Sequence, residues 1–156
     1  MISLTIDSKD ILHQLADLFE GVEEALDPEE ILDDAATILL SRITRRFRAQ
    51  VSPDGTKWQE SNAAMIRRLG GYTWSNGKKW TGGHTLFASG RLFRSFDIRD
   101  DGIGQRTIIN PTPYAIYVNG IYNGRWRFMG AAEQDIQLIL NMVQDRLNNT
   151  AAGISR

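Results

Sequence analysis

The sequence contains no cysteine and only two histidines, His13 and His84, among its 156 residues. The absence of cysteine excludes disulfides, thiolate catalysis and every zinc or iron–sulfur site that is built on cysteine. Two histidines alone supply few ligands for any other transition-metal site. We therefore expect no bound metal.

Long apolar runs are also missing. No run approaches the roughly 20 residues that a helix needs to cross a bilayer. Residues Met1 to Ile6 have neither the basic nor the hydrophobic region of a signal peptide. The sequence thus predicts a protein that is made in a cytoplasm and has no membrane partner.

The composition suits a folded protein, because 42% of the residues are hydrophobic and 24% are charged. A chain of this length fits one domain with a sizeable core. We therefore expect residues 1–156 to form a single domain, with an exposed loop at 70–83 and a flexible tail at 149–156.

The net charge of −1 hides a strongly polarised chain. Residues 1–40 hold eleven acids against Lys9 alone, whereas residues 41–130 hold fifteen lysines and arginines against five acids. Such asymmetry is typical of nucleic-acid contact, of acidic partners, or of subunits that join an acidic face to a basic one. Internal neutralisation between two faces of one domain remains the alternative.

The first third of the chain predicts one strand and two helices. Ile2, Leu4 and Ile6 alternate with polar residues, as in a half-buried strand. Apolar residues at helical spacing predict an amphipathic helix over residues 8–22. Asp27 followed by Pro28 marks the start of a second, longer helix, whose arginine-rich last turns suit the helix dipole.

The remaining elements are a hairpin and a final helix, separated by turns. Ser52 to Gly55 is turn chemistry, and residues 70–83 predict a long exposed loop. Residues 89–96 fit either a short helix or the approach to a strand. Residues 98–110 predict a hairpin around Asp101-Gly102. Turns are expected at Asn119-Gly120 and Asn123-Gly124, and a helix from about Ile136 to Leu147.

No constellation in the sequence predicts catalysis. The acids Glu29, Glu30, Asp33 and Asp34 lie in the first turns of a helix, where carboxylates stabilise the helix dipole. His84 lacks the accompanying serine and acid that a nucleophilic triad requires. We therefore expect a protein that is not an enzyme.

Aromatic residues beside basic ones are the strongest candidates for binding. They are Tyr72, Trp74, Lys78, Lys79 and Trp80 in the predicted loop, and Arg125, Trp126 and Arg127 further on. This mixture suits base stacking with phosphate neutralisation, but Trp, Tyr and Arg also dominate protein interfaces. We favour the protein interface and keep a nucleic-acid-binding module as the alternative.

The order and spacing of several short motifs resemble the phage virion morphogenesis family, whose members are also described as tail-completion proteins. The resemblance runs from about Leu39 to Leu147. It rests on a basic helix ending in Phe47, Pro53-Asp54-Gly55 with Trp58, Leu86, Ser89-Gly90-Arg91-Leu92 with Ser95, Pro113-Tyr114-Ala115, and Arg127-Phe128-Met129-Gly130. Two elements depart from the family pattern, at Tyr117-Val118-Asn119-Gly120 and at Arg125-Trp126-Arg127-Phe128.

The resemblance implies an α+β subunit without a cofactor. With the elements above, this means a small antiparallel sheet packed against the long helix and the C-terminal helix. It further implies a structural protein of the virion that forms or joins a ring, expected to be a hexamer, at the head–tail junction. Its partners would be copies of itself, neck or connector proteins, tail tube or sheath proteins, and DNA passing through the ring.

Two positions enter the set of interface candidates through this resemblance. They are Trp58, which follows the turn, and Phe128, which matches the aromatic residue before the family's glycine. We expect Phe128 to be buried, either as a core residue that holds the last helix or as an anchor between subunits.

Overall fold

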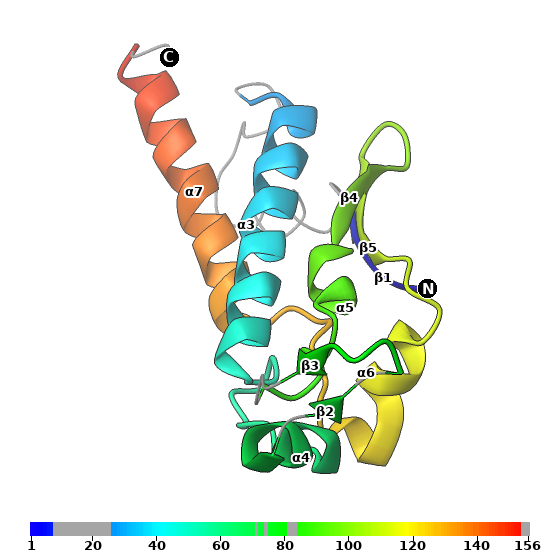
Figure 1. Cartoon of the computed structure of the whole chain (residues 1–156). Coiled ribbons are helices and arrows are strands. Elements are labelled where there is room, and N and C mark those ends of the chain that lie inside the picture. The colour runs from blue at the N-terminus through cyan, green and yellow to red at the C-terminus, as the bar shows by residue number, and fades with distance from the viewer. Residues whose placement is uncertain (8–25, 71, 74, 81–83, 154–156) are drawn as a thin grey trace. The chain divides into compact units, whose positions relative to one another are not determined.

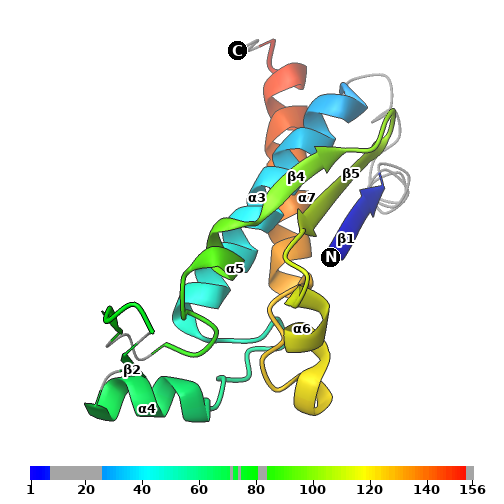
Figure 2. The same ribbon diagram turned by 45° about the vertical axis from the view of Figure 1, so that its right-hand side comes forward.

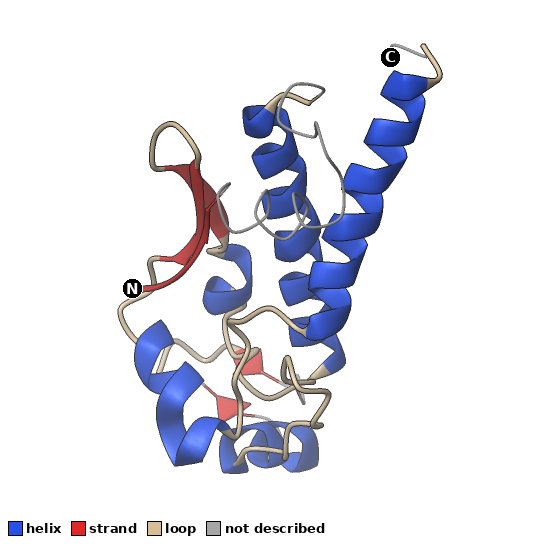
Figure 3. Ribbon diagram, turned by 180° about the vertical axis from the view of Figure 1, so that it is seen from behind, coloured by secondary structure: helices blue, strands red, loops and turns tan. Residues whose placement is uncertain are grey.

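The structure is a computed structural model, which describes residues 1–7, 26–70, 72–73, 75–80 and 84–153. It contains more helix than strand (Figure 3), and the predicted α+β class is confirmed. In chain order the elements are β1 (Ile2–Asp7), α3 (Pro28–Ala49), α4 (Asn62–Gly70), β2 (Tyr72–Thr73), β3 (Lys79–Trp80), α5 (Arg91–Arg94), β4 (Asp97–Asp100), β5 (Gln105–Asn110), α6 (Ala115–Gly124) and α7 (Glu133–Ala151).

The chain divides into two compact units that are each discontinuous in sequence. Unit 1 comprises residues 1–2, 43–96 and 110–130, and unit 2 comprises residues 3–42, 97–109 and 131–156. Helix α3 therefore contributes residues to both units. That the whole chain forms one domain stays a prediction.

The sheet of unit 2 has the strand order β1-β5-β4 (Figure 2). Strand β1 confirms the predicted alternation, since Ile2, Leu4 and Ile6 are half-buried whereas Ser3 and Thr5 are exposed. The predicted hairpin is also present, because β4 pairs antiparallel with β5 and Asp100 lies opposite Arg106. The hydroxyls of Thr5 and Thr107 are 3.1 Å apart and join β1 to the central strand.

Helices α3 and α7 run side by side within unit 2 (Figure 1). Helix α3 begins where the sequence predicts, because the carboxylate of Asp27 accepts a hydrogen bond from the backbone N–H of Glu29 at 2.9 Å. Ile31 of α3 and Val143 of α7 form a buried apolar cluster, against which half-buried residues pack. Those residues are Leu26, Leu140, Met142 and Leu147. This contact gives the two helices a shared apolar seam.

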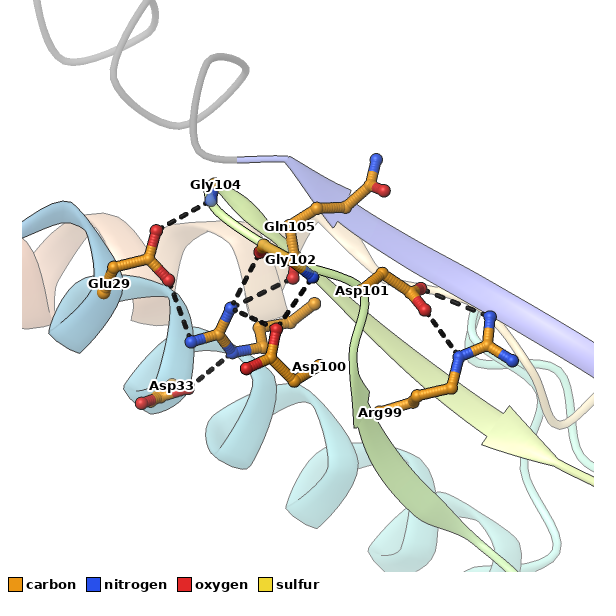
Figure 4. A network of polar contacts seen from close by, with 9 residues as sticks. Glu29, Asp33, Arg99, Asp100, Asp101, Gly102, Gly104 and Gln105 are labelled. Atoms are coloured by element: carbon orange, nitrogen blue, oxygen red, sulfur yellow. Dashed lines mark hydrogen bonds and ion pairs between the residues drawn. The ribbon is translucent and has the colours of Figure 1, made fainter.

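One arginine ties the hairpin to α3 (Figure 4). The guanidinium of Arg106 lies 2.7 Å from Asp33, 2.9 Å from Glu29 and 3.2 Å from Asp100. Its side chain is only 8% exposed. The hydrogen bond to Asp33 is the largest cause that raises the pKa of Arg106. Glu29 also accepts a hydrogen bond from the backbone N–H of Gly104 at 2.7 Å, so the same carboxylate holds the turn.

A second arginine ties α7 to α3. Arg146 donates to Glu30 at 2.8 Å and also to Asp34. The acids at the start of α3 therefore do more than stabilise the helix dipole, because four of them accept hydrogen bonds from Arg106 or Arg146 or pair with them. Part of the charge asymmetry is thus neutralised inside unit 2.

Unit 1 is centred on an aromatic cluster around Phe47, which is fully buried. Its ring centroid lies 5.2 Å from that of Trp58 and 5.6 Å from those of Phe93 and Phe128. Phe96 adds an edge-on contact at 6.0 Å. Such tilted and edge-to-face arrangements are the preferred geometry of aromatic pairs.

The predicted turn at residues 52–55 closes this core. Ser52 is buried and its hydroxyl accepts a hydrogen bond from the indole N–H of Trp58 at 3.0 Å. Gly55 adopts a positive φ of 86°, which glycine tolerates without strain. A Cβ atom on Gly130 would lie 3.1 Å from the Pro53 ring. The lack of a side chain at Gly130 therefore permits the close approach of the two segments.

Several elements predicted from the sequence differ in the structure, and one lies outside the described residues. Asn119-Gly120 does not form a turn but lies inside α6, whereas Asn123-Gly124 ends that helix with positive φ angles. The predicted loop at 70–83 contains the two-stranded ladder of β2 and β3. Residues 89–96, for which two interpretations were open, contain the short helix α5 at Arg91–Arg94, and β4 begins at Asp97. The predicted helix over residues 8–22 lies outside the described residues.

Two helices also differ from the sequence prediction. Helix α7 continues to Ala151, three residues past Asn148, and residues 154–156 lie outside the described part. Helix α4 was not predicted at all. Its start carries a recognisable signal, because the hydroxyl of Ser61 accepts a hydrogen bond from the backbone N–H of Ala64 at 3.2 Å.

Candidate interaction site

Unit 1 contains a pocket of about 500 Å³. Its walls come from the start of α4, the segment that leads into α5, helix α6, and the two residues Arg125 and Trp126. Apolar lining residues include Leu86, Leu92 and Val118. A concave site with an apolar lining and a few polar groups is the usual form of a binding pocket.

Hydrogen bonds of threonine and serine hold one wall in place. The backbone N–H of Ser61 donates to the hydroxyl of Thr85 at 3.0 Å, and that hydroxyl donates to the carbonyl of Gln59 at 3.5 Å. Leu86, which follows Thr85 in the sequence, adopts a φ of 61°. A positive φ is strained for a leucine, and such strain concentrates at functional sites. The wall is therefore fixed to α4 in an unusual conformation.

The Ser89-Gly90-Arg91-Leu92 motif shapes the second wall. The hydroxyl of Ser89 accepts a hydrogen bond from the backbone N–H of Arg91 at 3.2 Å, which stabilises the turn that leads into α5. Gly90 has a φ of 71°, and a Cβ atom there would lie 2.8 Å from Arg94. Only glycine suits this position, because any side chain would be strained and would displace Arg94.

The pocket carries an excess of positive charge. Three arginines line it, Arg67, Arg91 and Arg125, against the single carboxylate of Glu60. Arg67 is 7% exposed, donates to the carbonyl of His84 at 2.9 Å, and has its pKa lowered by burial. Arg91 and Arg125 are exposed.

Glu60 offsets little of this charge, because it already has a partner outside the pocket lining. Both of its oxygens accept hydrogen bonds from Arg68, at 2.8 and 3.0 Å. These hydrogen bonds lower the pKa of Glu60 and raise that of Arg68. The pocket therefore favours an anionic ligand.

Aromatic groups complete the lining. Trp126 is half-buried, and its indole N–H donates to the carbonyl of Gln59 at 2.8 Å. Tyr114 is 41% exposed. Of the predicted binding residues, Arg125 and Trp126 thus meet in this pocket, together with residues that the sequence did not single out, such as Arg67.

Exposed apolar residues flank unit 1 on two helices. On α4, Met65, Ile66 and Leu69 are 39%, 53% and 71% exposed. On α6, Ile116, Tyr117 and Ile121 are 55%, 75% and 40% exposed. Residues three or four apart share one face of a helix. Exposed apolar side chains that gather on a helix in this way are typical of interaction sites.

The other predicted interface residues are distributed differently. Trp58 and Phe128 are 7% and 0% exposed and pack in the aromatic core of unit 1, so Phe128 is buried as predicted. Lys78, Lys79 and Arg127 are exposed. Tyr72 and Trp80 lie opposite each other in the β2–β3 ladder, and Trp74 lies outside the described residues.

Three of the four arginines near the end of α3 contact groups of the same chain. Arg42 pairs with Asp135 at 2.8 Å in unit 2. In unit 1, Arg46 donates to the carbonyl of Gly130 at 2.7 Å, and the guanidinium of Arg48 lies 4.9 Å from the centre of the Phe93 ring. These contacts favour structural roles for the cluster over a phosphate-binding patch.

The described residues hold neither a metal-binding group nor a helix that could span a membrane. No group of three or more His, Asp or Glu side chains among them is arranged to hold a metal ion. None of the described helices is both long and apolar enough to cross a membrane. Comparison of the chain with protein-family models, curated proteins and solved structures finds no match.

Proposed function

We propose that this chain is a structural subunit of a bacteriophage tail or neck, which forms or joins a ring at the head–tail junction during virion assembly. The motifs that resemble the virion morphogenesis family suggest this role. The single observation that carries the proposal is the exposed apolar surface on α4 and α6, where six large side chains are at least 39% exposed. Surface of this kind is expected on a subunit that is buried in an assembly.

The residues of the resemblance have identifiable tasks in unit 1. Pro53 and Gly55 form the turn after α3, Gly90 allows the entry into α5, and Phe128 fills the aromatic core. These residues therefore have structural roles inside unit 1. They leave the surfaces of α4 and α6 available for neighbouring subunits.

The nucleic-acid-binding alternative draws on the basic middle segment. Several of its arginines, including Arg46, Arg48 and Arg106, already contact groups of the same chain. Binding that relied on the remaining cations would weaken steeply with salt. A titration of the chain with double-stranded DNA at two salt concentrations tests this alternative directly.

The proposed function is tested by the size of the particle in solution. Native mass spectrometry and light scattering of the chain, alone and with tail-tube or connector proteins, should reveal a closed ring or incorporation into one. A sixfold ring is the expected form, because repeated heterologous contacts close into rings. A strict monomer at every concentration, with every partner, contradicts the proposal.

A further inference from the structure

The pocket of unit 1 combines an apolar lining with exposed arginines. Its apolar lining, with Leu86, Leu92 and Val118, suits a bulky apolar side chain. Its exposed arginines, Arg91 and Arg125, suit carboxylates at the same ligand. The matching chemistry is a peptide segment in which acids alternate with large apolar residues.

The chain itself contains a segment of this composition. Residues 8–25, which lie outside the described residues, hold five acids against Lys9, and apolar residues stand between the acids. Those acids are Asp10, Asp17, Glu20, Glu23 and Glu24, and the apolar residues include Leu15, Leu18, Phe19 and Val22. The acids of α3 are less suitable, since Glu29, Glu30, Asp33 and Asp34 contact Arg106 and Arg146 of their own chain.

We propose that the pocket of one subunit binds the acidic segment, residues 8–25, of a second copy. The inference rests on the proposed function and names the contact through which neighbouring subunits join. Because the pocket and the segment are different parts of the chain, the contact is heterologous, and its repetition generates a ring. Opposite charges set the register and exclude wrong pairings.

Two variants separate the halves of this contact. The pocket variant carries Arg91→Gln and Arg125→Gln, and the segment variant carries Glu20→Gln, Glu23→Gln and Glu24→Gln. Each should keep the far-ultraviolet circular dichroism of the native chain but lose self-association by about tenfold or more. A control variant with Arg45→Gln and Lys57→Gln removes two exposed cations of unit 1 outside the pocket lining and should assemble normally.

Mixing the two variants provides the decisive measurement. The pocket variant retains an intact acidic segment, and the segment variant retains an intact pocket. An equimolar mixture should therefore form one-to-one dimers in native mass spectrometry and nothing larger. Assembly of either variant alone at the native level, or a mixture without dimers, overturns the proposal.

A second pocket variant distinguishes a loss of binding from a loss of folding. Arg91→Lys with Arg125→Lys keeps both charges but removes the forked guanidinium geometry, and it should assemble better than the glutamine variant. Equal assembly of the lysine and glutamine variants overturns the inference. A native chain that is monomeric alone but joins tail or connector proteins also overturns it, while leaving the proposed function in place.

Discussion

The Nε of Arg42 donates to the fully buried carboxylate of Asp135 at 2.8 Å and so joins α3 to α7. The other oxygen of Asp135 accepts a hydrogen bond from the backbone N–H of Ala132 at 2.8 Å, at the start of α7. One carboxylate therefore fixes both the beginning of a helix and its attachment to another. These two residues are 93 positions apart in the sequence.

Replacing Asp135 by Ala should destabilise unit 2 strongly. The change leaves Arg42 without this carboxylate and the backbone N–H of Ala132 without its acceptor. Because both lost hydrogen bonds involve a charged group, we expect a loss of about 3 kcal/mol in the free energy of unfolding. Urea unfolding measures this change in the free energy of unfolding. Glu133→Ala, in the same helical turn but exposed, should change it by less than about 0.5 kcal/mol.

Replacing Phe128 by Ala should destabilise unit 1. Its side chain is fully buried, with ring centroids 5.6 Å from Phe47 and 5.7 Å from Phe96. Loss of a buried aromatic ring leaves a cavity and costs about 3 to 5 kcal/mol. Thermal unfolding of the dilute chain measures the effect, and Tyr117→Ala is the exposed control. Normal melting with weakened assembly would instead identify Phe128 as an anchor between subunits.

The exposed face of α6 should matter for assembly and not for folding. Tyr117 is 75% exposed, so Tyr117→Asp should leave the melting temperature within about 2 °C, as surface substitutions usually do. The same change should reduce the fraction of assembled particles, because it places a charge in an apolar contact. Leu138→Asp on α7, where the leucine is 43% exposed, is the matched control. Equal assembly of both variants contradicts a role for α6.

The pair of Glu60 and Arg68 predicts a local dependence on pH. Hydrogen bonds from Arg68 hold the pKa of Glu60 below its usual range. Its folded pKa is thus lower than its unfolded one, so its contribution to stability is present above the unfolded pKa and is lost as pH falls through the folded one. Carboxyl titration by NMR should show the pKa of Glu60 rising to its usual range in Arg68→Gln.

A second carboxyl provides the internal control for that titration. The pKa of Asp54 is lowered mainly by hydrogen bonds from Thr56, so Arg68→Gln should leave it unchanged. A Glu60 whose pKa is the same with and without the Arg68 guanidinium would show that the pair does not persist in solution.

Shortening the β2–β3 segment tests its role in assembly. Residues 73 and 75–79 are exposed, and the backbone turns at Gly77 with a φ of 79°. Replacing residues 70–83 by a short glycine–serine linker should therefore preserve folding. It should impair assembly, since the sequence of the segment combines aromatic and basic residues, which are common in protein interfaces. Normal yields of infectious particles from this variant would reduce the segment to a spacer.

Elements with strong local signals could be predicted from the sequence. Asp27 and Pro28 mark the start of α3 because capping is local chemistry. The β4–β5 hairpin follows from Asp101-Gly102 between β-favouring residues. The interior of α6 was misjudged, because Asn119-Gly120 has the composition of a turn. There the side chain of Asn119 accepts hydrogen bonds from the backbone N–H groups of Phe128 and Met129, both at 2.9 Å.

The pocket could not be predicted, because it depends on contacts between distant segments. Trp126 reaches the carbonyl of Gln59, 67 positions away, and Arg67 reaches that of His84. Nothing local to Arg67 distinguishes it from Arg68, yet one is buried and the other is exposed. The aromatic and basic composition around Arg125 and Trp126 was a usable signal, and it identified two of the lining residues.

Unit 2 is built from three separate stretches of the chain, which has a consequence for its folding during synthesis. Arg146 contacts Glu30 and Asp34, which leave the ribosome more than a hundred residues earlier. Synthesis proceeds from the N-terminus at roughly 5 to 20 residues per second. Several seconds therefore pass between the synthesis of the α3 acids and that of their partner Arg146 in α7. A chain that stops before α7 lacks Arg146, Asp135 and Val143 and cannot complete unit 2. Products that terminate just before α7 would therefore contain every residue of unit 1 but lack the last part of unit 2.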